Sequence, residues 1–491
     1  MKNLIASIQK PAEIVLALVI IGEVLAFGGV QPVAYSFMEI VIFGLVLFLL
    51  VNQARAGQIQ LALPIWPVLF AAFVVFQLIP IPKSWISHLD PSRLLPGNLV
   101  ALEHRHSAWT TISIYPHATV LLLLKFLAYS GAFAVAAFVF NSSSRKSLLV
   151  RVLMFLGLFE AAYGMAQYLA NWQKIFWMNK VYYTSEATGT YINHNHFAGF
   201  LELTFPFMLA WVFYYFQIWQ DGRRRGRSHA DRAVASAASI QSLLYSFLLV
   251  VAVVAVIFSR SRAGILATVF TVLFLAILAQ LKTRRKAWTL GLAAFLLIAI
   301  GYGLWIGLNP VVGRFEAFKG GAEYLEEEGR LPIWKSTIAM IHDHPLTGMG
   351  LGTYTSAVRH YQTYLVNYTV THAHGDFLEL TAGTGLVGAA LLFVPIFVLL
   401  GMMVHSFLTD PRRFRPAVTL GCIGGTLALL IHSVADFNLQ IPANALVFAV
   451  VLGIGYKTCI ERRADQAKMA AAAPSISAHH VQRKSHHSHA R

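Results

Sequence analysis

Runs of about 20 apolar residues recur along the whole chain, and each is long enough to cross the roughly 30 Å hydrocarbon core of a bilayer as a helix. The composition agrees, because 57% of the 491 residues are hydrophobic and only 12% are charged, whereas a soluble protein carries about 25% charged residues. The apolar excess must face lipid. The sequence therefore predicts an all-α polytopic membrane protein. It excludes a disordered chain, a coiled coil and, with only two cysteines, a disulfide-linked scaffold.

About twelve transmembrane spans are expected. Their approximate ranges are 12–28, 36–52, 61–80, 118–140, 148–169, 197–219, 240–258, 264–281, 288–308, 377–403, 417–436 and 442–459. The first span follows Lys2 and Lys10 as the core of a signal peptide would. With eleven more spans behind it, an uncleaved helix is the simpler interpretation.

The lysines and arginines predict the orientation of the bundle, because connections rich in these residues stay in the cytoplasm. Most of the 38 fall at the termini and in alternate connections, at positions 55, 145–146, 223–227, 282–286 and 412–415. Both termini are therefore expected in the cytoplasm. Since this distribution accounts for much of the formal net charge of +16, no nucleic-acid partner is expected.

Three connections on the opposite side, 81–117, 170–196 and 309–376, are too long to be simple turns. The last of them has helical patterns over 331–341 and 354–368 with a Pro/Gly-rich break between them, which predicts a small helical cap on the outer face. The tail, 461–491, is rich in alanine, serine, histidine and basic residues. A disordered cytoplasmic tail is expected there, with metal binding as the alternative.

Arginines also occur on the outer face, where the insertion rule does not place them. Arg260 and Arg262 lie in a very short outer connection, and Arg330 precedes the predicted loop helix. One interpretation is that they extend to phospholipid headgroups. The other is an anion clamp, because a guanidinium offers a planar, permanently charged fork that matches phosphate. The acidic run 326–328 could instead pair with Arg330.

Histidines gather on the same side, at 194, 196, 342, 344, 360, 372 and 374. Zinc is one interpretation, but the two His-x-His pairs lack the spacing of a familiar metal site, so no metal is assigned. Acid–base chemistry is another, because histidine titrates near neutral pH, and hydrogen-bonding helix caps are the third.

His374 is the strongest candidate base, because it lies where the outer loop re-enters the membrane. Asp376 is expected to cap the helix that begins there, and Glu379 is expected one turn deeper, near the face of His374.

Two rival functions rest on other residues. A serine hydrolase would use Ser259 or Ser261, but the sequence has no Gly-x-Ser-x-Gly elbow. A transporter would use the charged residues within the spans, Lys125, Glu160 and Glu202. Lys125 and Glu160 could instead simply pair across neighbouring helices. The transporter stays open as the main non-enzymatic alternative.

Five segments occur in a specific order: GTYINHNHFA at 189–198, SRSRAG at 259–264, GRLPIW at 329–334, HPLTGMGLG at 344–352, and His374 with Gly385 and Gly388. Together they resemble the O-antigen ligase and polymerase-like family of bacterial membrane glycosyltransferases. The family pattern has Asn, Ser or Gln directly after the histidine, where this chain has Gly375. The first 140 residues look most like members found with exopolysaccharide assembly systems, which favours a polymerase over a ligase.

The resemblance implies a lipid-dependent glycosyltransferase (GT-C-like) architecture with a helical periplasmic loop domain. It implies transfer of a glycan from undecaprenyl diphosphate to a sugar hydroxyl at the periplasmic face, most simply to polymerise O-antigen or exopolysaccharide repeat units. Attachment of the glycan to lipid A-core by an O-antigen ligase is the alternative. His374 would be the catalytic base of an inverting, metal-independent reaction that needs no cofactor, and Arg262, Arg330 and Arg260 would bind the diphosphate.

The substrate-binding residues implied by the matching segments are Asn193, Asn195, His196 and His372. The expected partners are the lipid-linked donor, a second lipid-linked glycan or lipid A-core as acceptor, the bilayer and polysaccharide assembly proteins. The expected location is the bacterial inner membrane, with the active site facing the periplasm.

Four regions are expected along the chain. They are 1–184 with transmembrane helices one to five and outer loops, 185–403 with the O-antigen ligase-related core and its periplasmic loop 309–376, 404–460 with helices eleven and twelve, and the tail 461–491.

Overall fold

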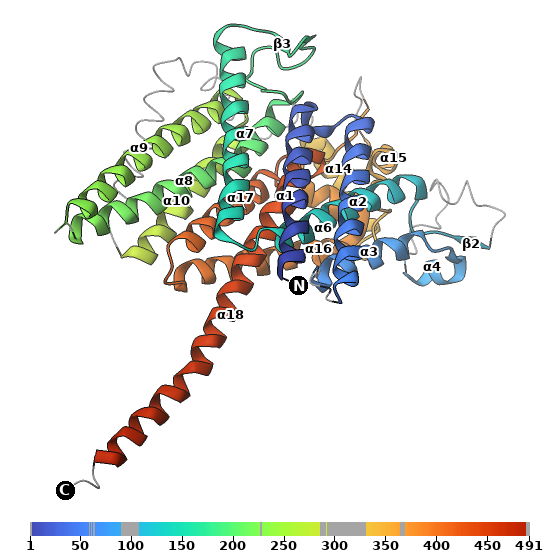
Figure 1. Cartoon of the computed structure of the whole chain (residues 1–491). Coiled ribbons are helices and arrows are strands. Elements are labelled where there is room, and N and C mark those ends of the chain that lie inside the picture. The colour runs from blue at the N-terminus through green and yellow to red at the C-terminus, as the bar shows by residue number, and fades with distance from the viewer. Residues whose placement is uncertain are drawn as a thin grey trace.

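The computed structural model describes residues 2–57, 59, 61, 64–89, 108–225, 228–284, 291, 330–363 and 369–487. These residues form a bundle of long helices with short helices and two small two-stranded sheets at its edges (Figure 1). The long helices are α1 (Lys2–Leu25), α2 (Pro32–Arg55), α3 (Ile65–Leu78), α6 (Pro116–Val139), α7 (Ser143–Leu169), α8 (His194–Arg225), α9 (His229–Phe258), α10 (Arg262–Thr283), α14 (Arg330–Asp343), α16 (Asp376–Thr409), α17 (Phe414–His432) and α18 (Pro442–His487).

The short elements lie in the connections. They are η1 (Phe27–Gly29), β1 (Ile81–Pro82), α4 (Lys83–Leu89), β2 (Trp109–Thr110), β3 (Lys174–Ile175), β4 (Met178–Asn179), α15 (Tyr354–Ala357), η4 (Val358–His360) and η5 (Asn438–Gln440). Strand β1 pairs antiparallel with β2, and β3 pairs antiparallel with β4.

Nine helices in the described part of the chain are long and apolar enough to cross a membrane, which confirms the all-α polytopic fold. They are α2, α6, α7, α8, α9, α10, α16, α17 and the first part of α18. The predicted first span is occupied by α1, which carries Lys10, Glu13 and Glu23, and the third by α3, which has only 14 residues. The predicted span 288–308 lies outside the described residues apart from position 291, so the count of twelve stays a prediction.

Helices α8 and α17 form the centre of the bundle, since 83% of the apolar window of each is buried inside the protein. Glycines make this close packing possible. A Cβ atom at Gly421 would lie 2.3 Å from the ring of Phe207, and one at Gly424 would lie 2.4 Å from Pro206. Small residues that let two backbones approach are the usual means of helix packing in lipid.

The Pro/Gly-rich break predicted at 345–352 packs its backbone directly against α16. Gly350 N donates to Gly383 O at 2.8 Å, and Leu386 N donates to Pro345 O at 2.7 Å. Gly385 interrupts the helix with a left-handed φ of 64°, which removes its regular hydrogen bonds and frees this edge for the loop. The segment 345–352 is thereby fixed to the first half of α16.

Two helix predictions in this region differ in outcome. The pattern over 331–341 is confirmed by α14. The second helix expected over 354–368 is wrong in extent, because α15 has four residues and passes into the single turn of η4, while 364–368 lie outside the described residues.

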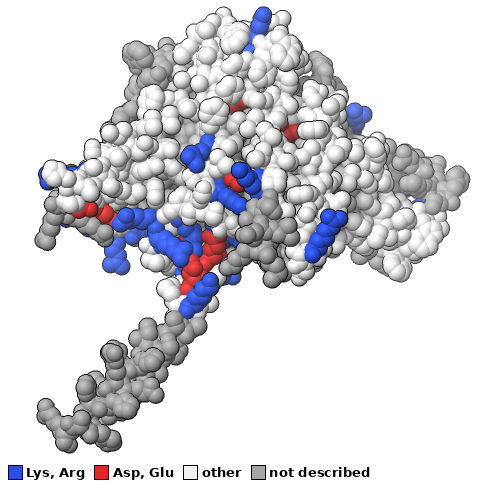
Figure 2. Space-filling model, viewed as in Figure 1, with Lys and Arg blue, Asp and Glu red and all other residues white. Residues whose placement is uncertain are grey.

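The two chain ends lie at the same end of the bundle (Figure 1). There, α18 leaves the bundle and continues as a helix to His487, so the expectation of a disordered tail is wrong for 461–487. An alanine-rich segment that continues a preceding helix has high helix propensity, which explains the difference. Figure 2 shows charged side chains of both signs gathered where α18 leaves the bundle, whereas the rest of this face is nearly uncharged.

Candidate functional site

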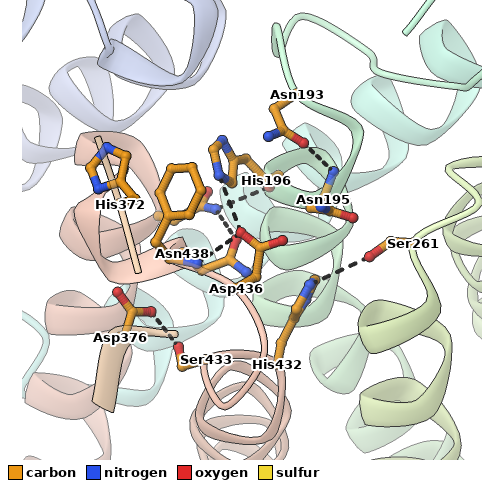
Figure 3. A network of polar contacts seen from close by, with 12 residues as sticks. Asn193, Asn195, His196, Ser261, His372, Asp376, His432, Ser433, Asp436 and Asn438 are labelled. Atoms are coloured by element: carbon orange, nitrogen blue, oxygen red, sulfur yellow. Dashed lines mark hydrogen bonds and ion pairs between the residues drawn. The ribbon is translucent and has the colours of Figure 1, made fainter. Parts of the chain in front are cut away.

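The candidate site lies at the opposite end of α16 from this charged region, where four separate segments meet (Figure 3). The first turn of α8 contributes His196, and the segment before α16 contributes His372 and His374. The connection between α17 and α18 contributes Asp436, and Arg330 is the first residue of α14. The structure thus gathers residues from parts of the chain up to 240 positions apart.

The ring of Phe437 contacts the rings of three predicted histidines. Its ring stacks on His372 with centroids 4.1 Å apart and an interplanar angle of 11°. It meets His374 edge-on at 5.2 Å and His196 edge-on at 4.7 Å. A single aromatic side chain therefore fixes the relative positions of the three rings.

Asp436 is the buried anion of the site, with 1% of its surface exposed. Its Oδ1 accepts a hydrogen bond from Phe437 N at 2.7 Å and lies 3.5 Å from His196 Nε2. Its Oδ2 lies 4.0 Å from Arg330 Nη2, which is too long for a hydrogen bond. Burial alone would raise the pKa of Asp436, but the interaction with His196 and the nearby cations outweigh it and lower the pKa. Asp436 is therefore ionised.

Glu379 pairs with His372, not with the face of His374 as the helical spacing predicted. Its Oε1 lies 3.0 Å from His372 Nδ1, and its Oε2 accepts a hydrogen bond from Ala373 N at 2.9 Å. Burial opposes a proton on His372, but the carboxylate of Glu379 outweighs burial and raises the pKa of His372. His372 thus carries a positive charge over a wider pH range than a free histidine does.

Asp376 does not cap its own helix. The residue before α16, Gly375, has no side-chain cap, and Asp376 Oδ2 instead accepts hydrogen bonds from Ser433 Oγ at 2.7 Å and from Leu439 N at 2.9 Å. The prediction of a cap is therefore wrong. Asp376 ties the start of α16 to the connection that carries Asp436 and Phe437.

His374 has a buried ring nitrogen that is not used, and unlike that of His196, which lies 3.5 Å from Asp436 Oδ1, it has no carboxylate within ion-pair distance among the described residues. Its Nδ1 is buried and has no hydrogen-bond partner among the described residues. Its backbone has a left-handed φ of 50°, and the next carbonyl toward the N-terminus, that of Ala373, accepts a hydrogen bond from Trp334 Nε1 at 3.0 Å. Burial lowers the pKa of His374, Asp436 opposes this, and the guanidinium of Arg330 adds to it. The ring is therefore neutral at pH 7 and can accept a proton.

The predicted arginines pair with different carboxylates. Arg260 Nη1 donates to Ser185 Oγ at 3.2 Å and lies 3.7 Å from Glu186 Oε1, whereas Arg330 faces Asp436. Arg262 begins α10, whose first turn is capped by Ser261 Oγ accepting from Gly264 N. The structure does not draw the three guanidiniums into one contact cluster.

The predicted residues 193–196 open α8. Asn193 Oδ1 accepts a hydrogen bond from Asn195 N at 2.8 Å, which gives Asn193 a structural role at the helix start. His194 Nδ1 lies 2.6 Å from Ser259 O at the end of α9. Of these residues, His196 contacts Asp436, as Figure 3 shows.

Sequence reasoning missed the connection between α17 and α18. Residues 433–436 were assigned to the span 417–436, but α17 ends at His432. The available signal was the run of polar residues His432, Ser433, Asp436 and Asn438, which interrupts an apolar stretch and is followed by Asn444. Asn444 Nδ2 donates to His196 O and to Asn438 Oδ1, both at 3.0 Å, and so links this connection to α8.

A second buried pair lies beneath the site. His432 Nδ1 lies 3.0 Å from Glu202 Oε2, and His432 Nε2 lies 3.4 Å from Ser261 Oγ (Figure 3). The order Ser–His–carboxylate resembles a hydrolase triad. Ser261 is 1% exposed and its hydroxyl oxygen already caps α10, so a substrate cannot reach it.

The pairing of Lys125 with Glu160 that the sequence suggested is not present. Glu160 accepts hydrogen bonds from Thr190 N at 2.8 Å and from Thr190 Oγ1 at 2.7 Å, while Lys125 Nζ lies 3.5 Å from the ring centroid of Tyr35. In the part of the chain that the structure describes, no group of three or more His, Cys, Asp or Glu side chains is arranged to hold a metal ion.

Comparison with known families gives one match. Residues 247–393 match the family model Wzy_C, described as O-antigen ligase. Comparison with curated proteins gives no match. The matched segment contains Arg260, Arg262, Arg330 and His374, and it ends before Asp436.

The match supports a glycosyltransferase-like enzyme of the O-antigen ligase or polymerase type. Together with the membrane-spanning helices, it supports a multi-pass protein of the bacterial inner membrane. The resemblance expected from the sequence is confirmed over residues 247–393, which match the O-antigen ligase family model.

Proposed function

We propose that this protein transfers a glycan from undecaprenyl diphosphate to a sugar hydroxyl at the periplasmic face, and that it polymerises lipid-linked repeat units. The observation that carries the proposal is the neutral, half-buried His374, whose Nδ1 is unused and lies within the electrostatic influence of Arg330. A base and a fixed cation side by side are what this transfer requires: one group accepts the acceptor's proton, and the other stabilises the leaving diphosphate.

The reaction follows from these two roles. His374 accepts the proton of the acceptor hydroxyl while that oxygen attacks the anomeric carbon of the donor sugar. The bond between the anomeric carbon and the diphosphate oxygen breaks, and the diphosphate leaves with the electron pair. Attack from the side opposite the leaving group inverts the anomeric configuration. Neither a metal nor a cofactor has a step in this scheme.

Arg330, Arg262 and Arg260 are proposed to bind the diphosphate. The 4.0 Å separation of Arg330 from Asp436 supports this role, because the guanidinium is held in place without being saturated by its carboxylate. An incoming diphosphate offers closer oxygens and more negative charge than Asp436 does. We therefore expect Arg330 to exchange part of its interaction with Asp436 for the substrate.

The remaining predicted residues have supporting roles in this proposal. Glu379 raises the pKa of His372 and so favours its protonated form, which would present a charged donor beside the base. His196 and Asn195 lie in the first turn of α8 next to Asp436, and Asn193 holds that turn in shape. We propose that the first turn of α8 contacts the sugar of the donor or of the acceptor.

The periplasmic orientation rests on the two ends of the bundle. The charged region where α18 leaves the bundle contains Arg145, Arg412 and Arg413, and cation-rich connections are retained in the cytoplasm. The candidate site lies at the other end of α16 and so is proposed to face the periplasm. Reporter fusions after residues 57 and 363 test this: an alkaline phosphatase fusion is expected to be active only after residue 363.

An O-antigen ligase is the second candidate, and the description of the matched family favours it. Purified protein given only undecaprenyl-diphosphate-linked repeat units should yield a ladder of longer lipid-linked chains if it polymerises. Product that appears only after lipid A-core is added would establish the ligase. If neither mixture gives product while a vesicle assay shows substrate crossing the bilayer, the enzyme proposal fails and a transporter replaces it.

A further inference from the structure

A small cavity lies at the end of α16 that is remote from the candidate site. Its volume is about 240 Å³, and it is lined by Gly401, Met402, His405 and Ser406 of α16 and by Cys459, Arg462 and Arg463 of α18. Its charged lining residues, Arg462 and Arg463, lie on α18, which leaves the bundle at the charged region of Figure 2.

Arg462 is the unusual residue of this cavity. Only 6% of its surface is exposed, its Nε is buried without a hydrogen-bond partner, and it forms no ion pair within the described residues. Burying a guanidinium without a counter-charge is strongly unfavourable, because the lost hydration is not replaced. An anion from outside the chain is the simplest way to satisfy it.

The chain's own carboxylates near Arg462 are committed elsewhere. Glu461 pairs with Lys146, and Asp465 pairs with both Arg412 and Arg415. These contacts engage Glu461 Oε2 and Asp465 Oδ2 with cations other than Arg462.

The other charged and titratable groups around the cavity are cationic or neutral. Arg463 and His405 are exposed at its rim. Lys282 of α10 interacts electrostatically with Arg462, and its Nζ donates to Phe407 O and, at 2.9 Å, to Asp410 O. The cavity therefore concentrates positive charge that the described part of the chain does not neutralise.

A second, apolar cavity adjoins the first. It has a volume of about 260 Å³, lies among α3, α6, α16 and α18, and shares Met402 with the cationic cavity. Its lining on α16 extends from Asp376, at the start of this helix, to Met402. The twelve residues from Leu391 to Met402, next to the cationic cavity, rise about 17 Å, which is close to the roughly 15 Å thickness of one leaflet's hydrocarbon.

We propose that these adjoining cavities bind one anionic phospholipid of the leaflet on this side, with its phosphate against Arg462 and an acyl chain along Met402 into the apolar cavity. The cationic cavity alone would also suit free phosphate. The adjoining apolar cavity is long enough for an acyl chain and favours the lipid, and basic pockets between transmembrane helices are known to bind anionic headgroups. The far end of the apolar cavity reaches Asp376 and Leu439. The proposed phosphate site at Arg462 lies at the other end of α16 and does not depend on the proposed glycosyl transfer.

Lipid binding to the full-length purified protein tests the proposal. After delipidation in detergent, phosphatidylglycerol or cardiolipin should raise Tm and remain bound in native mass spectrometry, whereas phosphatidylcholine and inorganic phosphate should not. Arg462→Gln should weaken binding of phosphatidylglycerol by about 10- to 100-fold, the loss expected for a charge-assisted hydrogen bond. The matched control is Arg151→Gln, since Arg151 is exposed and its Nε donates to Ser147 O.

A second variant tests the acyl-chain half of the proposal without removing charge. Met402→Trp fills the junction of the two cavities and should also weaken phosphatidylglycerol binding while Arg462 stays intact. This variant keeps the test decisive if Arg462→Gln does not fold. Stabilisation by inorganic phosphate equal to that by phosphatidylglycerol would overturn the lipid assignment. Unchanged phosphatidylglycerol binding in either folded variant would overturn the site.

Discussion

The two ends of α16 handle buried charge in opposite ways. Near Asp410, the guanidinium of Arg415 contacts two carboxylates, those of Asp410 and Asp465. Near the start of α16, Arg330 stands 4.0 Å from its carboxylate and His374 Nδ1 has no partner within the described residues. Complete pairing fixes helices against one another, whereas incomplete pairing leaves polar groups that a substrate can satisfy. The difference assigns a structural role to the Arg415 pairs, although Arg462 at the same end stays unpaired within the described residues, and it assigns chemistry to Arg330 and His374.

The largest expected effect is the loss of transfer activity when His374 is replaced, compared with the replacement of an exposed histidine. His374→Ala removes the proposed base and should lower the rate of glycan transfer by about 10²–10⁴-fold, the usual contribution of general base catalysis. The measurement is product formation from purified lipid-linked donor, with Tm as the check on folding. His342→Ala is the matched control, because the His342 side chain is 87% exposed and pairs only with its neighbour Asp343. Equal activity of the two variants would remove His374 from the mechanism.

The next largest expected effect is a loss of stability when a buried ion pair is broken at the Asp410 end of α16. Arg415→Gln leaves the buried carboxylate of Asp410 without its cation, and breaking a buried pair in this way costs about 3–5 kcal/mol. A large fall in Tm is expected, with normal activity per folded molecule. Arg412→Gln should change stability by less than about 1 kcal/mol, since the Arg412 side chain is 59% exposed. If the two variants melt alike, the pairing near Asp410 is not what holds this end together.

Replacing Arg330 should lower activity with little effect on stability, the reverse of the effect expected for Arg415. Arg330→Lys keeps the positive charge but loses the planar fork that matches a diphosphate, so transfer should fall by about 10²–10³-fold with little change in Tm. Arg359→Lys, at an exposed position of the same cap, is the control. Near-normal transfer by Arg330→Lys would show that the cation serves Asp436 and not the substrate.

Much of the fold follows from the sequence, because apolar length and helical spacing are local properties. The nine apolar helices and α14 lie where these patterns placed them. The extents of α15 and α18 do not follow from local patterns. The length of a tyrosine-rich or an alanine-rich helix depends on what its last residues pack against, and residue spacing does not show this. The count of twelve depends in part on 288–308, outside the described residues.

The site was predictable to the level of residue type and location but not of pairing. His196, His372, His374 and Arg330 do converge, yet Phe437, which organises the three rings, contacts His372 across 65 positions of sequence. The helical spacing predicted that Glu379 lies near the face of His374. That assignment fails because His374 precedes the helix with a left-handed backbone, so the 3.6-residue period does not apply to it.

The smallest expected effect is a change in the pH dependence of transfer. His374 acts as a base only when neutral, and burial and Arg330 lower its pKa from the ordinary value of 6.5. Activity should therefore be present above that lowered pKa and be lost as pH falls through it, which places the acid limb below pH 6.5. The protonated ring of His372 also lowers the pKa of His374. His372→Gln removes that charge, so the acid limb should move to higher pH while kcat at alkaline pH changes less. The measurement is kcat against pH for the wild type, His372→Gln and the exposed control His342→Gln. A limb that stays in place in His372→Gln would show that another group titrates, and the contrast between the two ends of α16 would then rest on Arg330 and not on the histidine.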